Sequence, residues 1–283
     1  MLSDLKYNIR PLQSVVLSIF KEYAEICQKY GFRYYAAYGT ALGAIRHKGF
    51  IPWDDDFDVV MPREDYNKFV KVVQKELPHH LRFSRGGERP CSPIYFGKIL
   101  DESVGLMESL SKETEMNISE PPFIDIFVLD YVPASVLDFK RWWRERRLWR
   151  LCQMWRYPRS CYCSSQKGLQ LLCARVLGLF LNGCYRKTVS NEDMMQVLDE
   201  ILAKRFPSEH VVEGAFFRMK EARLLSRKLF EPARLVPFED TQIRVAYNVE
   251  EILQQYYGDY MKLPPEKDRV PPHVLRHNYE GHV

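Results

Sequence analysis

Four aspartates fall within five residues, from Asp54 to Asp58, directly before an apolar run. In a strand that starts at Asp56, side chains i and i+2 share one face, so Asp56 and Asp58 point together while the residues between them turn into the core. Side-by-side carboxylates repel, and one takes up a proton unless a cation lies between them. Because magnesium and manganese favour oxygen ligands, the pattern predicts a metal site. The alternative is a solvated acidic turn before an ordinary strand.

Gly39 and Thr40 follow an aromatic, apolar run, residues 32–38, that predicts a strand. Glycine lets a phosphate approach the backbone, and the free N–H groups at a helix start attract anions. The threonine hydroxyl can add a hydrogen bond. We therefore expect a phosphate cradle where this strand turns into a short helix, with a purely structural cap as the alternative.

Asp125 is a lone charge inside the run 122–129, which otherwise has the apolar character of a buried strand. A buried, unpaired carboxylate is costly, so we expect Asp125 to share the metal or to act as a base. The alternative is an acid that pairs with an arginine. Asp130 lies past the predicted strand end and is predicted to cap the turn at 131–133.

These motifs together resemble the nucleotidyltransferase fold, and residues 38–66 resemble its LicD-type branch, which includes phosphocholine transferases and fukutin-related proteins. The end of the chain, residues 257–267, is similar to the closing motif of that family. The residues similar to the three-part signature of the fold are, in order, Gly39-Thr40, Asp56-Phe57-Asp58-Val59 and Ile124-Asp125-Ile126.

The resemblance implies an α/β (α+β) fold, in which a small mixed β-sheet is flanked by helices. The catalytic core would comprise residues 1–133 and 230–283, with a helical insertion at 134–229 that is rich in tryptophan, arginine and cysteine. The implied activity is transfer of a phospho-alcohol group, with phosphocholine as the first candidate, from a CDP-activated donor such as CDP-choline. The implied acceptor is a hydroxyl of a cell-surface glycan precursor, free or lipid-linked, as in modification of lipopolysaccharide or teichoic acid.

The resemblance also implies roles for individual residues. Mg²⁺ (or Mn²⁺) would be held by Asp56, Asp58 and Asp125, the last of which could instead take the proton of the acceptor. Lys98 lies in a predicted strand, residues 95–100, where it could hold a phosphate or be a surface lysine. The expected substrate contacts are Gly39, Thr40, Arg46, Lys48 and Lys98.

Two other functions remain open at this point. A nucleotidylyltransferase that moves NMP from an NTP shares the three carboxylates, but the long LicD-type stretch and the closing motif argue against it. A non-catalytic glycan-binding protein at the membrane surface could use the same fold, although the presence of all three acids argues against decay of the site. The sequence does not separate choline from ribitol or another alcohol on the donor.

Composition agrees with one medium-sized enzyme. The 283 residues, 46% of them hydrophobic, can bury a full core, and the net charge of +4 is too small to indicate nucleic acid. The start of the chain lacks the apolar core of a signal peptide, and the seven cysteines are irregularly spaced. We therefore expect a cytoplasmic protein, with contact at the inner face of the membrane as a further option.

Residues 138–156 mix arginines and lysine with four of the five tryptophans. This pattern suits peripheral contact with an anionic membrane, or binding of an anionic glycan acceptor. Tryptophans that pack on the core while the arginines face water are the alternative. The cysteines between 152 and 184 predict free thiols rather than a zinc site, because their spacing does not repeat and no histidine lies nearby.

Periodicity predicts the remaining elements. Helices are expected at 12–30, 63–77, 136–155, 167–181, 191–206 and 249–257. Strands are expected at 95–100 and 104–107, as a hairpin, and at 234–236 and 242–246.

Overall fold

The structure is a computed structural model of the chain. It describes residues 9–85, 96–105, 107–110, 117–133, 135, 137–144, 209–213, 224–271 and 274–277. Most of the predicted helical insertion lies outside the described residues, and so do the helices predicted at 167–181 and 191–206 and the cysteines between 152 and 184.

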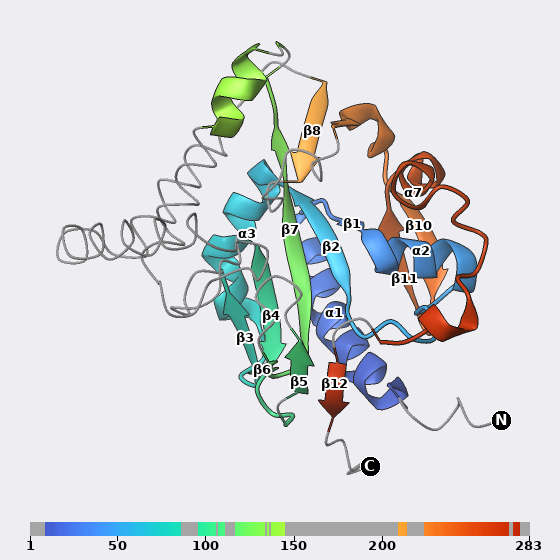
Figure 1. The fold of residues 1–283 in the computed structure, drawn as a ribbon. Helices are drawn as coiled ribbons and strands as arrows, with labels where there is room; N and C mark the ends of the chain where they lie inside the picture. The colour runs from blue at the N-terminus through green and yellow to red at the C-terminus, as the bar shows by residue number, and fades with distance from the viewer. Residues whose placement is uncertain are drawn as a thin grey trace, which may run out of the picture.

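A mixed sheet forms the centre of the molecule (Figure 1). Its strand order is β1-β2-β7-β4-β3, and β8 pairs with one end of β7 and with β9. Strands β2 and β7 run parallel, whereas the other pairs in this sheet are antiparallel. The bounds are β1 Tyr35–Ala36, β2 Asp58–Pro62, β3 Leu81–Ser84, β4 Gly97–Asp101, β7 Phe123–Tyr131, β8 His210–Glu213 and β9 Leu225–Ser226. The predicted mixed sheet flanked by helices is confirmed.

Helices α1 (Arg10–Tyr30) and α3 (Arg63–Glu76) cover one face of the sheet. Phe57, just before β2, is fully buried and its ring stacks on Phe20 of α1, with the centroids 4.5 Å apart. The predicted alternation at this strand is therefore correct. Helix α1 ends at Tyr30, as predicted, and is capped by Gly31, whose φ of 68° is the left-handed conformation that favours glycine.

Helix α2 (Tyr38–His47), helix α7 (Val249–Tyr257) and the hairpin of β10 (Arg234–Phe238) and β11 (Thr241–Val245) gather beside β1 (Figure 1). The hairpin turn holds the end of α2, because the Glu239 amide donates to the Lys48 carbonyl at 2.9 Å. The Phe50 amide in turn donates to the Glu239 carboxylate at 3.0 Å. The end of the chain thus packs on its first half, and the predicted helix 249–257 is confirmed with both strands before it.

The hairpin predicted from 95–100 and 104–107 is wrong. Strand β4 pairs with β3 and β7, whereas β5 (Met107–Leu110) pairs with β6 (Asn117–Glu120) and β12 (Val274–His277) in a separate sheet. The strand predicted at 32–38 is only β1, because α2 already begins at Tyr38. The strand predicted to start at Asp56 starts at Asp58 instead. The Asp58 amide donates a hydrogen bond to the Thr40 side chain, which fixes the end of the preceding loop.

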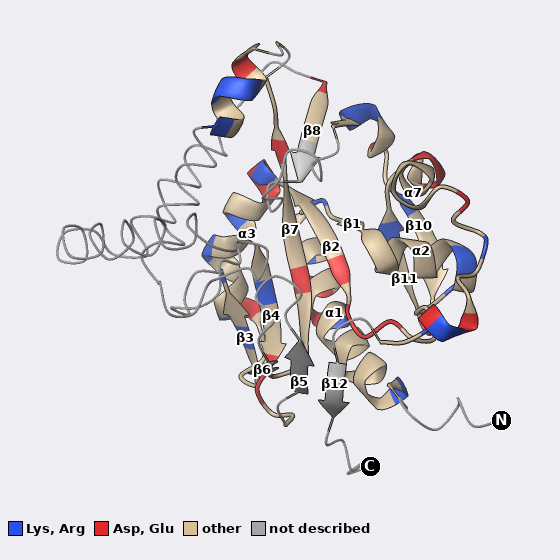
Figure 2. Ribbon diagram, viewed as in Figure 1, with Lys and Arg blue, Asp and Glu red and all other residues tan. Residues whose placement is uncertain are grey.

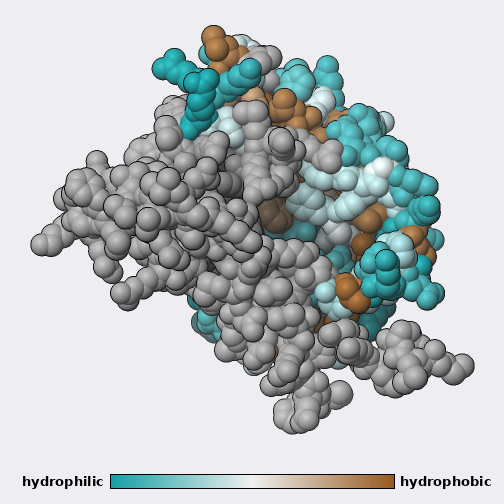
Figure 3. Space-filling view, viewed as in Figure 1, coloured by the Kyte–Doolittle hydropathy of each residue, from teal (hydrophilic) through white to brown (hydrophobic). Residues whose placement is uncertain are grey.

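The start of the tryptophan-rich stretch is described, and residues 137–144 are helical. Trp142 and Trp143 are buried, whereas Arg141 and Arg144 are exposed. Burial of these two tryptophans and exposure of these two arginines agree with the packing interpretation, and the tryptophan rings contact each other and Phe139. Residues 145–156 lie outside the described residues. No described helix is both long and apolar enough to span a membrane. The described surface in view is largely hydrophilic, with hydrophobic residues in small groups (Figure 3).

Candidate metal and phosphate site

Three charged side chains form a row across the middle of the sheet. Asp58 of β2 pairs in register with Asp125 of β7, and Asp125 pairs in register with Lys98 of β4. Because in-register neighbours point to the same side, all three lie on the face opposite α1 and α3. The acidic segments of β2 and β7 lie side by side, with a basic segment of β4 next to them (Figure 2).

The acidic loop before β2 adds more carboxylates to this row. The carboxylate oxygens of Asp54, Asp55 and Asp56 can all lie within 4.8 Å of one another. Burial raises the pKa of the Asp58 carboxyl well above its ordinary value, and the charges of Asp56, Asp125 and Asp54 raise it further. The nearby Lys98 acts in the opposite direction.

The acidic cluster is defined here as Asp54, Asp55, Asp56, Asp58 and Asp125, and its donor type fits a hard divalent cation. Among the described residues, Asp54, Asp55 and Asp56 have carboxylate oxygens close enough to share one ion, and Asp58 and Asp125 lie beside each other on the adjoining strands. The donors of the cluster are carboxylate oxygens, which magnesium and manganese prefer, and their mutual repulsion falls when a cation lies between them. Sequence reasoning selected three of these acids and noted the run that contains Asp54 and Asp55. It did not select those two as ligands, because a run of acids does not show which members turn toward a common point.

Two buried polar side chains hold the acidic loop. Gln13 of α1 donates from Nε2 to the carbonyl oxygens of Ile51 and Asp54, at 3.1 and 2.8 Å. The Asp58 amide donates to Thr40 Oγ1 at 2.8 Å. Gln13 was missed from the sequence, since a glutamine in an amphipathic helix gives no sign that it is buried.

Gly39 lies in the first turn of α2, where a Cβ atom would collide with the Asp54 carboxylate. Glycine therefore lets this carboxylate approach the start of the helix, where the free N–H groups favour negative charge. The predicted phosphate cradle thus lies directly beside the acidic cluster. Thr40 accepts a hydrogen bond from Asp58, which leaves its own hydroxyl proton to donate.

Alanine at the two glycines of α2 should have different effects. At Gly43 a Cβ atom would meet the Gly49 carbonyl, which is backbone, so Gly43→Ala should lower the free energy of unfolding by about 1–3 kcal/mol. At Gly39 the obstacle is a side-chain end that can rotate away. Gly39→Ala should therefore keep a free energy of unfolding close to that of the parent but lose activity. Chemical unfolding and turnover of both variants check this. Loss of stability at Gly39 with full activity would contradict it.

The basic candidates lie in three different settings. Lys98 is buried, with Nζ 3.1 Å from Asp125 Oδ1 and 3.2 Å from the centroid of the Phe123 ring, so the surface-lysine alternative is wrong. Arg46 is partly buried and donates from Nη1 to the Tyr260 carbonyl at 2.7 Å. Lys48 is exposed at the far end of α2, about 14 Å from Gly39 at the helical rise per residue.

The closing motif also reaches the acidic cluster. Tyr257 is 44% exposed as a whole residue, but desolvation of its hydroxyl raises its pKa, and the charges of Asp58, Asp54 and Asp56 raise it further. The hydroxyl therefore lies within electrostatic range of the cluster. Arg46 joins the same motif through the Tyr260 carbonyl. The sequence places this motif within the resemblance but gives no sign that Tyr257 approaches the acids.

Asp130 does not cap a turn, and that prediction is wrong. It is completely buried inside β7, which continues to Tyr131 because β8 pairs with this end of the strand. Its two carboxylate oxygens accept from Arg63, at 2.6 Å from Nε and 3.1 Å from Nη2. The sequence did not reveal the partner, which lies 67 residues earlier.

Comparison with known proteins decides the family. Residues 31–89 match the domain described as "LicD/FKTN/FKRP, nucleotidyltransferase domain". Over 276 residues the chain is 30% identical to "Lipopolysaccharide cholinephosphotransferase LicD" of Haemophilus influenzae, with 95% of this chain and 97% of that protein covered. The chain belongs to the LicD family. An uncharacterized protein of Rickettsia typhi is 30% identical over 109 residues, which are 36% of this chain and 35% of that protein.

Membership of the LicD family confirms the resemblance drawn from the motifs and makes the chain a LicD-family transferase with a nucleotidyltransferase domain. The matched domain contains α2, the acidic loop, β2 and α3. Strands β4 and β7, which add Lys98 and Asp125, follow the match. The full acidic cluster is therefore assembled only when the sheet beyond the matched residues is included.

Proposed function

We propose that this chain transfers a phospho-alcohol group from a CDP-activated donor to a hydroxyl of a cell-surface glycan precursor. Phosphocholine is the group, CDP-choline the donor and the glycan of a lipopolysaccharide the first acceptor to test. The observation that carries the proposal is the 30% identity, over 95% of this chain, to a protein named as a lipopolysaccharide cholinephosphotransferase. The acidic cluster supports it, because a diphosphate donor needs cationic neutralisation.

The reaction is an in-line displacement at the phosphorus that carries the alcohol. The acceptor oxygen forms a new bond to this phosphorus, the bond to the CMP oxygen breaks, and CMP leaves. Mg²⁺ or Mn²⁺, when bound by Asp56, Asp58 and Asp125, supplies neutralisation of the diphosphate and of the leaving oxygen. The acceptor proton passes to Asp125 or to water, and Asp125 must lie within hydrogen-bond reach to take it.

The remaining proposed contacts surround this centre. Gly39 and Thr40 bring the start of α2 to a phosphate, where N–H groups and the threonine hydroxyl can donate. Lys98 adds positive charge next to Asp125. Arg46 and Lys48 are proposed as second-line phosphate contacts, toward the other end of α2.

The test is incubation of the pure chain and magnesium with CDP-choline, CDP-ribitol, CDP-glycerol or an NTP. Each reaction is run with and without a choline-free lipopolysaccharide glycan. We expect CMP release from a CDP-alcohol, faster with the glycan and abolished by EDTA, together with phosphocholine on the glycan by mass spectrometry. Pyrophosphate release from an NTP without CMP would identify a nucleotidylyltransferase instead. No product from any donor would favour a non-catalytic role.

A further inference from the structure

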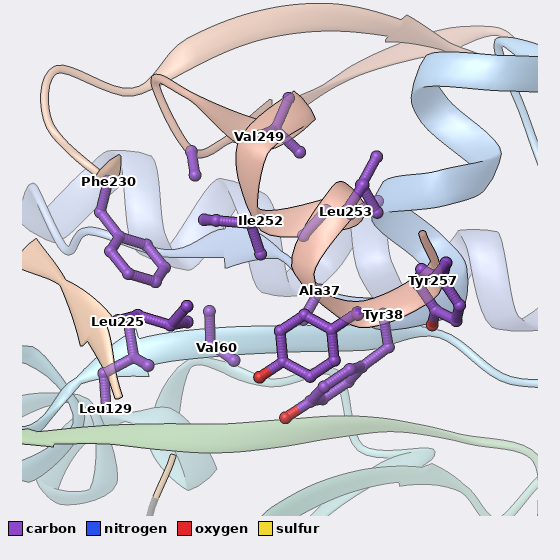
Figure 4. Close-up of a pocket in the computed structure, with 14 residues that line it drawn as sticks. Ala37, Tyr38, Val60, Leu129, Leu225, Phe230, Val249, Ile252, Leu253 and Tyr257 are labelled. Atoms are coloured by element: carbon purple, nitrogen blue, oxygen red, sulfur yellow. The ribbon is translucent and has the colours of Figure 1, made fainter. Parts of the chain in front are cut away.

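An apolar pocket lies between α7 and the sheet (Figure 4). Val60 of β2 and Leu129 of β7 line it from the sheet, and α7 covers it. Phe230 lies at one end of the pocket, and Tyr38 and Tyr257 lie toward the other (Figure 4). The described lining side chains carry no charge, and their only polar atoms are the hydroxyls of Tyr38, Tyr256 and Tyr257.

This pocket begins where the acidic cluster ends. Val60 lies two residues beyond Asp58 on the same face of β2, a step of roughly 7 Å along the strand. Tyr38 directly precedes Gly39, and Tyr257 lies within electrostatic range of three of the acids. A phosphate bound at the cluster would thus lie close to the apolar and aromatic walls of this pocket.

The aromatic end of the pocket is held in place by ring contacts. The Tyr38 ring packs edge-to-face against Phe127, with the centroids 5.4 Å apart, and in the same way against Tyr256 at 5.4 Å. Phe127 lies two residues beyond Asp125, on the side of β7 that carries the acid. The rings therefore stand in a fixed arrangement next to the phosphate position.

These surroundings favour one kind of alcohol on the donor. A quaternary ammonium group has apolar methyl groups for the apolar walls, a positive charge that aromatic rings attract, and no hydrogen-bond donors to satisfy. The neighbouring carboxylates attract the same charge. A polyol such as ribitol would lose hydrogen bonds to water and find only three tyrosine hydroxyls among the described lining side chains.

We propose that this pocket binds the quaternary ammonium group of the donor's alcohol, and that Tyr38 and Tyr256 select choline-type donors over polyol donors. The inference rests on the proposed function and names the residues that determine donor specificity.

The first experiment uses the unaltered chain. KM is measured for CDP-choline, CDP-ribitol and the neutral isostere of CDP-choline in which a tert-butyl group replaces the trimethylammonium. We expect CDP-choline to have the lowest KM, about tenfold below the isostere, because only the cation is attracted by the rings. An isostere that binds as well as CDP-choline would overturn the proposal, and so would equal use of CDP-ribitol. Failure of all CDP-alcohols would instead reject the proposed function.

The second experiment changes one ring. Tyr256→Leu should raise KM for CDP-choline about tenfold and leave KM for the neutral isostere close to the parent value, because it keeps an apolar wall and removes the ring. Tyr256→Phe, which keeps the ring, should restore the parent KM. Tyr247→Leu, at an exposed tyrosine outside the pocket, is the matched control. Equal KM changes for both donors in Tyr256→Leu would mean that the ring only shapes the pocket, and would overturn the proposal.

Discussion

Asp58→Asn should lower turnover by roughly 1,000-fold or more while the chain remains folded. Asp58 lies at the centre of the acidic cluster, beside Asp125 in the sheet and close to Asp56. Loss of one carboxylate weakens the hold on a cation whose neutralising effect amounts to several kcal/mol of the barrier, which corresponds to this fold-change. Steady-state CMP release from the parent and the variant, over a range of magnesium concentrations, measures it.

The same variant should be more stable than the parent when metal is removed, and increasingly so as the pH rises. Burial and neighbouring carboxylates raise the pKa of Asp58 in the folded chain. Between about pH 4, where the unfolded aspartate ionises, and this raised pKa, the folded chain keeps a proton that the unfolded chain releases. Stability of the parent therefore falls as pH rises through this window, and asparagine removes that loss. Melting temperatures in EDTA test the sign.

A matched control is Asp240→Asn, which makes the same chemical change at an exposed acid paired with Lys21 at 2.7 Å. Because an exposed pair contributes little, this variant should keep both turnover and melting temperature. Excess magnesium should raise the melting temperature of the parent and of Asp240→Asn more than that of Asp58→Asn. Near-parent turnover of Asp58→Asn in magnesium would contradict the site assignment.

Most of the described helices could be predicted because their signals are local. Helix α1 has an amphipathic period and is followed by Gly31, and at the entry to β2 acids alternate with Phe57 and Val59. The lone buried charge of Asp125 predicted a role at the metal, but not its pairing with Asp58, since 67 residues separate the two and nothing local fixes the register of β2 against β7. Once the strands pair in parallel, that register places both acids on one face.

What could not be predicted depends on contacts between distant residues. Gln13 looks like a solvated helix position until the loop at Ile51 and Asp54 covers it. Lys98 could equally have been a surface lysine, and only the register with Asp125 shows that it is buried. Asp130 followed a plausible strand end, but β8, which begins at His210, pairs there and extends the strand.

Asp130→Asn should lower the free energy of unfolding by about 3–5 kcal/mol, because it leaves the Arg63 guanidinium charged and without its carboxylate in a buried site. Asp130 is fully buried and Arg63 is 4% exposed, and two hydrogen bonds join them. Chemical unfolding of the parent and the variant measures the loss. A change within about 0.5 kcal/mol is typical of substitutions at exposed positions, and would contradict the burial of this ion pair.

The double variant Arg63→Met/Asp130→Leu separates charge pairing from strand register. Removing both charges together avoids an isolated buried charge, so its stability should lie within about 1 kcal/mol of the parent or above it. Arg63 directly follows β2 and Asp130 lies on β7, the two strands that carry Asp58 and Asp125. A slip of one residue between these strands would turn either Asp58 or Asp125 toward α1. Because the alternation of buried and acidic residues around Phe57 also specifies the register, we expect the double variant to retain turnover.

A stable double variant without turnover would show that the Arg63–Asp130 pair itself holds Asp58 and Asp125 side by side.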